Sequence, residues 1–147
     1  MAPWRWGNVP LPEPHLGAIA AGVVLAFIMP WRLFSTPWLG HVLGWPVVLA
    51  GFALAVWAVR AAGEVGLQRP DRLVVRGPYA LSRNPMYVGW TLLYVGIAFV
   101  LNSAWLLVLL PAVFVLTHLV IRGEERQLDA LLGEAYIVYR SRVRRYL

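Results

Sequence analysis

The chain has 147 residues, of which 60% are hydrophobic and only 14% are charged. This is too apolar for an ordinary soluble domain, which is about half apolar and about a quarter charged. The net charge of +6 comes from arginine without any lysine, and the absence of cysteine excludes disulfides, thiolate metal sites and cysteine nucleophiles.

Four apolar runs predict four transmembrane helices within one membrane domain, residues 1–147. The runs cover residues 16–34, 42–60, 86–101 and 104–121. Each is close to the roughly 17–25 residues that cross the hydrocarbon layer as a helix. The first run is the weakest, because Pro30 and Arg32 interrupt it; we interpret it as an uncleaved membrane helix. The expected fold class is all-α, a polytopic membrane protein with about four transmembrane helices.

Arginine is concentrated in two segments, which predicts the orientation. Arg60, Arg69, Arg72, Arg76 and Arg83 stand between the second and third runs, and Arg122, Arg126, Arg140, Arg142, Arg144 and Arg145 follow the fourth. By the positive-inside rule both segments are cytoplasmic, and with four spans both termini are too. The arginine-only composition and the simple four-span build favour a prokaryotic inner membrane. Because the arginines flank apolar runs, we expect membrane lipids and no nucleic acid as partners.

The second half of the chain has two further features. Only Asn102 and Ser103 separate the third and fourth runs, which predicts a tight antiparallel hairpin. Apolar residues then recur at intervals of three and four through residues 124–145. We expect a separate amphipathic helix there, beginning at the Glu124–Glu125 pair, interrupted near Gly133 and lying at the membrane surface.

Charged and turn-forming residues gather at residues 76–89 and 122–125, where two helices meet the interface. Each has a structural explanation on its own. Asn84 and Pro85 suit a helix N-cap and the first helical position. Glu124 and Glu125 suit the first turn of a helix.

Taken together, these segments resemble the isoprenylcysteine carboxyl methyltransferase and phospholipid methyltransferase superfamily. The matching residues are the turn Gly77-Pro78-Tyr79, the helix opening Arg83-Asn84-Pro85-Met86-Tyr87-Val88-Gly89, the acidic pair Glu124-Glu125, and Leu128, Gly133, Tyr136 and Tyr139 in the family's order. The resemblance covers residues 73–143. Asn84 stands where the eukaryotic enzymes carry histidine, so this position can form hydrogen bonds but cannot titrate.

The resemblance implies an enzyme that transfers a methyl group from S-adenosylmethionine to a lipophilic acceptor at the cytoplasmic face. The acceptor is an isoprenylcysteine-like carboxylate or another small apolar or lipid molecule. The candidate cofactor-binding residues are Tyr79, Arg83, Asn84, Pro85, Tyr87, Glu124 and Glu125. The candidate catalytic residues are Glu124 and Arg122, which matches a family arginine that orients the acceptor. A snorkelling arginine that ends the fourth helix explains Arg122 equally well.

Other interpretations stay open at this level. A sterol-type membrane reductase that uses NADPH has a similar C-terminal helical arrangement, although no basic and aromatic set for its ribose phosphate is present. A non-catalytic membrane scaffold is the third possibility. His118 suits either a pocket lining or a helix-packing hydrogen bond. No spacing of His or carboxylate residues suggests a metal site, and the oligomeric state is undetermined.

Overall fold

A computed structural model of the protein describes residues 12–63, 65, 70 and 72–147. These residues form five α-helices and no strand, which confirms the all-α fold class. The elements are α1 (Glu13–Ile28), α2 (Pro37–Ala62), the short 3₁₀ helix η2 (Gly77–Ala80), α3 (Pro85–Val100), α4 (Ala104–Leu132) and α5 (Glu134–Arg142).

Two of the helices, α2 and α4, are long and apolar enough to cross a membrane. Helices α1 and α3 have 16 residues each, or about 24 Å, which is less than the roughly 30 Å of a hydrocarbon core. Large apolar side chains nevertheless cover the outside of the bundle. Examples are Phe27, Trp38, Leu49, Phe52, Phe114 and Leu119, each more than half exposed. Such a surface is typical of a protein that is surrounded by lipid.

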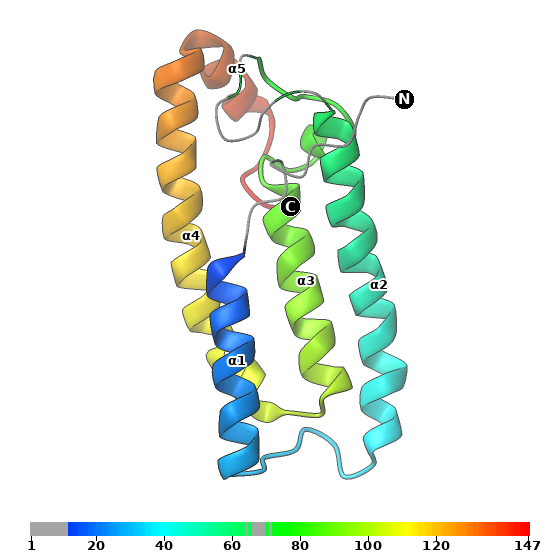
Figure 1. The fold of residues 1–147 in the computed structure, drawn as a ribbon. Coiled ribbons are helices and arrows are strands. Elements are labelled where there is room, and N and C mark those ends of the chain that lie inside the picture. The colour runs from blue at the N-terminus through cyan, green and yellow to red at the C-terminus, as the bar shows by residue number, and fades with distance from the viewer. Residues whose placement is uncertain (1–11, 64, 66–69, 71) are drawn as a thin grey trace.

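The helices alternate in direction, so that the α1–α2 and α3–α4 connections lie at one end of the bundle and η2 and α5 at the other (Figure 1). Asn102 ties the two connections together. Its Oδ1 accepts hydrogen bonds from the backbone N–H groups of Leu33 (3.1 Å) and Phe34 (2.8 Å), and its Nδ2 donates to Phe34 O (2.9 Å). Its φ of 50° lies in the left-handed region that asparagine tolerates. The tight turn predicted at residues 102–103 is therefore confirmed.

Helices α2 and α3 approach so closely that their contact requires glycine. A Cβ atom added at Gly51 would lie 2.7 Å from Gly89 O, and one added at Gly89 would lie 2.9 Å from Gly51 O. Gly44 and Gly96 repeat this reciprocal contact two helical turns away. Small residues allow membrane helices to pack backbone against backbone. Helix α3 is thus packed mainly against α2, whereas α4 is packed mainly against α1 rather than against its hairpin partner.

The expected separate helix beginning at Glu124 is wrong in its start, because α4 continues without a break to Leu132. Charged residues mark where the helix leaves its apolar stretch, and they do not interrupt its backbone hydrogen bonds. The break expected near Gly133 is confirmed: this residue has a φ of 53° and separates α4 from α5. Helix α5 ends at Arg142, not at residue 145, and the last residues turn back toward the bundle (Figure 1).

Candidate functional site

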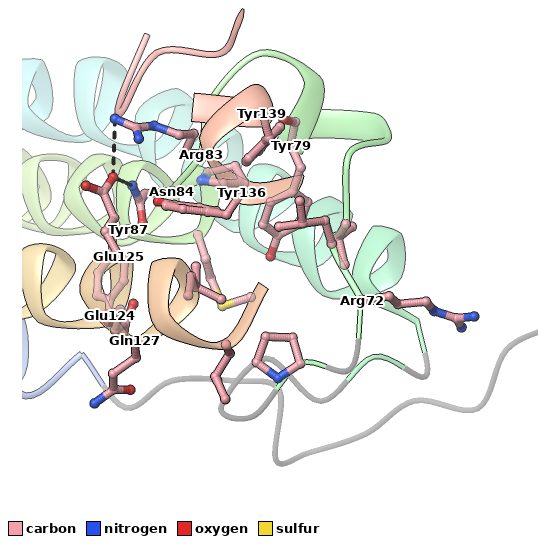
Figure 2. Close-up of a pocket in the computed structure, with 17 residues that line it drawn as sticks. Arg72, Tyr79, Arg83, Asn84, Tyr87, Glu124, Glu125, Gln127, Tyr136 and Tyr139 are labelled. Atoms are coloured by element: carbon pink, nitrogen blue, oxygen red, sulfur yellow. Dashed lines mark hydrogen bonds and ion pairs between the residues drawn. The ribbon is translucent and has the colours of Figure 1, made fainter. Parts of the chain in front are cut away.

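A cavity of about 240 Å³ lies at the end of the bundle that carries η2 and α5 (Figure 2). It is lined by Pro70, Arg72, Leu73 and Val74 before η2, by Tyr79, Arg83, Asn84, Pro85, Met86 and Tyr87 around the start of α3, by Glu124, Glu125, Gln127, Leu128 and Leu131 of α4, and by Tyr136 and Tyr139 of α5. All seven residues predicted to bind the cofactor are in this lining. Two segments about 40 residues apart in sequence therefore share one cavity.

The local backbone explains how the tyrosine side chains reach the cavity. Gly77, with a φ of 61°, lets η2 turn against α2, where an added Cβ would lie 3.1 Å from Ala61 Cβ. Tyr79 follows in η2 and is buried, and the Tyr139 hydroxyl donates a 2.7 Å hydrogen bond to its carbonyl. Burial raises the pKa of both tyrosine hydroxyls well above the usual value, so both groups stay protonated. This contact fastens α5 over the cavity.

Glu125 is a buried carboxylate that collects several donors. Arg145 donates from Nη2 to Oε2 at 2.8 Å and from Nε to both oxygens at 3.1 Å. Arg83 Nη2 and Asn84 Nδ2 each lie 3.4 Å from Oε1, and Figure 2 shows Arg83 and Asn84 meeting at this carboxylate. A charge buried to this degree, with the residue 7% exposed, is tolerated only with such partners.

Asn84 occupies the N-cap position of α3, with Pro85 as the first helical residue, but its side chain makes no capping hydrogen bond. Its Nδ2 instead donates to Arg145 O at 3.1 Å and, more weakly, to Glu125. The helix-cap explanation of this side chain is therefore wrong, although the helix starts where it was expected. Asn84 acts as a link between α3, α4 and the end of the chain.

Glu124 makes the second link between α3 and α4. The Tyr87 hydroxyl donates a 2.7 Å hydrogen bond to Glu124 Oε1. This distance is typical of a well-formed O–H···O hydrogen bond. The two acids thus contact different partners: Glu124 bonds to Tyr87 in α3, and Glu125 contacts Asn84 and Arg83 just before α3.

Several polar atoms of the lining have no partner within the described part of the chain. They include Arg83 Nε and Nη1 and the Tyr136 hydroxyl, all of which are buried. Arg83 and Tyr136 are close enough to interact electrostatically with each other. Buried donors in native proteins almost always have an acceptor. Donors that face a cavity without one are suited to a ligand with a carboxylate or another strong acceptor. Most of the other lining residues are aromatic or apolar, which suits a planar base.

Not every candidate residue reaches the cavity. Arg122 is exposed on α4 and is not part of the lining. His118 is not in the lining either: its Nδ1 is 2.8 Å from the hydroxyl of Tyr146, which follows α5, and its ring is stacked near Phe114. Its hydrogen bond therefore joins α4 to the last residues of the chain and not to another helix. Arg72 lines the rim, but its guanidinium points away from the other labelled residues (Figure 2). Arg69 lies outside the described residues.

Tyr136, Tyr139 and Arg145 were not among the predicted site residues. The two tyrosines belong to the pattern that carried the resemblance, so their spacing was an available signal. Arg145 gave no such signal, because it is one of several arginines in the tail and its partner Glu125 is 20 residues away.

The model of the family described as phospholipid methyltransferase matches residues 39–135, well over half of the chain. No match is found among curated proteins. The matched range includes the cavity lining from Pro70 to Leu131 and stops just before Tyr136.

Proposed function

Because the chain belongs to the phospholipid methyltransferase family, part of the isoprenylcysteine carboxyl methyltransferase-like superfamily of membrane methyltransferases, we propose that it transfers a methyl group from S-adenosylmethionine to a lipophilic acceptor at the cytoplasmic membrane face. The observation that carries this proposal is the shared cavity. It places the Tyr79–Tyr87 segment against the acidic pair of α4, and it contains buried Arg83 donors without a partner.

The residues present fit the parts of this cofactor. Arg83 and Tyr136 supply donors for its carboxylate, and the acidic pair suits its ammonium and ribose hydroxyl groups. The rings of Tyr79 and Tyr87 suit adenine and the sulfonium cation. The cavity of about 240 Å³ is slightly smaller than the roughly 300–1,000 Å³ of small-molecule pockets. We therefore expect binding to widen the rim.

When bound, the cofactor supplies a methyl group that its sulfonium sulfur activates. The protein then has to orient the two reactants and exclude water. The Tyr87–Glu124 hydrogen bond fixes the wall between α3 and α4, and Met86, Leu128 and Leu131 supply apolar surface. Both acids border the cavity in this proposal, and Glu125 is bound mainly by Arg145 and only weakly by Arg83 and Asn84.

Arg122 is proposed to act on the acceptor from outside the cavity. It is exposed on α4 only two residues before Glu124, so it can meet the headgroup of a lipid that approaches along the helix. A guanidinium can bind an acceptor carboxylate or phosphate through two hydrogen bonds. The proposed acceptor is accordingly a lipophilic molecule with an anionic group near the methylated atom.

In the proposed topology α1 and α3 cross the membrane together with α2 and α4, and residues 124–145 lie at the cytoplasmic surface of a single domain. The placement of η2 and α5 at one end of the bundle supports this topology (Figure 1), because the arginines next to these two elements are then on one side. Residues 1–11 lie outside the described residues, and their cytoplasmic placement follows from the arginine distribution. The membrane is proposed to be a prokaryotic inner membrane.

Equilibrium binding to the protein purified in detergent tests the function. We expect S-adenosylhomocysteine to bind and NADPH not to bind. NADPH binding alone would favour a reductase, and binding of neither would favour a scaffold. A labelled methyl donor incubated with membrane extracts should then transfer its label to a lipid-soluble product, which identifies the acceptor.

A further inference from the structure

Residues 143–147, here called the C-terminal strap, fold back onto the segment before α3. Arg83 N donates a 2.9 Å hydrogen bond to Arg144 O, and Ser82 Oγ donates to Arg145 O at 3.2 Å. Farther along, the Tyr146 hydroxyl lies 2.8 Å from His118 Nδ1 on α4. The strap is thus fixed on both sides of Arg145, and this residue has a defined position beside the cavity.

The Arg145 side chain competes with Arg83 for the same carboxylate. Arg145 reaches Glu125 at 2.8 Å and 3.1 Å with two nitrogen atoms, whereas the shortest Arg83 contact is 3.4 Å. A guanidinium that binds through two nitrogens forms the stronger pair. Arg83 therefore keeps Nε and Nη1 without a partner, although its side chain is only 9% exposed.

We propose that Arg145 is a positioning residue: by occupying Glu125 it keeps the Arg83 guanidinium available for the carboxylate of S-adenosylmethionine. Without Arg145, the buried Glu125 would have Arg83 as its remaining cation. A buried carboxylate strongly favours a full ion pair, so Arg83 would turn toward it and lose its free donors. This inference rests on the proposed function, since it assumes that the cavity binds this cofactor.

The test compares two ligands on purified variants in detergent. Loss of a charge-assisted contact to the ligand carboxylate should weaken S-adenosylhomocysteine binding by about tenfold in Arg145→Ala. Methylthioadenosine, which lacks the amino acid group, should bind this variant within about twofold of the wild type. Arg142→Ala is the matched control, because Arg142 is an exposed arginine that ends α5, and it should bind both ligands normally. Arg145→Gln replaces Arg145→Ala if the latter does not fold.

A double-mutant cycle with Glu125→Gln tests the physical cause. With residue 125 neutral, Arg83 is no longer drawn away, so adding Arg145→Ala should change S-adenosylhomocysteine affinity by less than about twofold. An equal loss in both backgrounds, or an equal loss of both ligands, would overturn the positioning role and indicate general destabilisation. If the wild type binds S-adenosylhomocysteine and the Arg145 variants bind it with the same affinity, this inference alone is overturned. No binding of S-adenosylhomocysteine by the wild type overturns the proposed function with it.

Discussion

The substitution Asn84→Asp separates two explanations of Asn84 that the sequence alone leaves open. As a helix N-cap, aspartate is as good as asparagine, so the change would be neutral. In the structure the side chain does not cap α3, and its Nδ2 lies 3.4 Å from Glu125 Oε1 and 3.1 Å from Arg145 O. Aspartate would place a second carboxylate beside a buried one and would remove the donor to the carbonyl.

The magnitude follows from these two contacts. Loss of the hydrogen bond costs about 0.5–1.5 kcal/mol. Repulsion between two charges 4 Å apart is about 4 kcal/mol at an effective dielectric constant of about 20, and Arg83 and Arg145 offset a large part of it. We therefore expect Asn84→Asp to lower the free energy of unfolding by about 2–4 kcal/mol.

Thermal unfolding in detergent, combined with S-adenosylhomocysteine affinity, measures the effect. Thr36→Asp is the matched control, because Thr36 is the exposed N-cap residue of α2 and also makes no side-chain cap; there an added acid should be neutral or slightly stabilising. Unchanged stability and unchanged ligand affinity in Asn84→Asp would refute the role of Asn84 in the Glu125 cluster.

Three further predictions concern other parts of the account. Glu124→Gln should weaken S-adenosylhomocysteine binding by about fivefold, because the Tyr87 hydroxyl and the ligand lose a carboxyl group as their hydrogen-bond partner; normal affinity by calorimetry would remove Glu124 from the site. Gly51→Ala should lower stability by about 1–3 kcal/mol through overpacking against α3, whereas Gly17→Ala, with no atom within 4 Å of the added Cβ, should not; equal melting temperatures would contradict the close approach. Arg122→Ala should reduce turnover of the lipid acceptor more than cofactor affinity, and normal turnover would leave Arg122 as an interfacial residue.

Hydropathy predicted the helical fold, and the resemblance to the methyltransferase superfamily supplied seven cofactor-site candidates, all of which line the cavity. Predictions from the sequence were wrong where the structure depends on contacts between residues that are far apart in the chain. Glu124 and Glu125 look like a helix start because a charged pair follows an apolar run, yet no residue there breaks the helix before Gly133. The charged pair marks the point where α4 changes from apolar to charged residues, and the helix itself ends later, at Leu132.

The contacts of Asn84 and the pairing of α2 with α3 could not be predicted for the same reason. The asparagine side chain turned from its own helix to Arg145 O and Glu125, and no local pattern shows that those groups are near. The short connection between α3 and α4 predicted that these two helices pair. The main packing partner of α3 is instead α2, where Gly44 and Gly51 face Gly96 and Gly89. The equal seven-residue spacing of these glycines was the available signal for that pairing.

Photochemical labelling with radioactive S-adenosylmethionine tests most directly whether the turn before α3 and the body of α4 form one ligand site. The membrane-embedded protein is irradiated with the bound ligand, digested and mapped by mass spectrometry, with excess S-adenosylhomocysteine as competitor. The shared cavity predicts competable label both in the peptide containing Tyr79–Tyr87 and in the peptide containing Glu124–Glu125. Competable label confined to one of these peptides, or found only elsewhere in the chain, would contradict it.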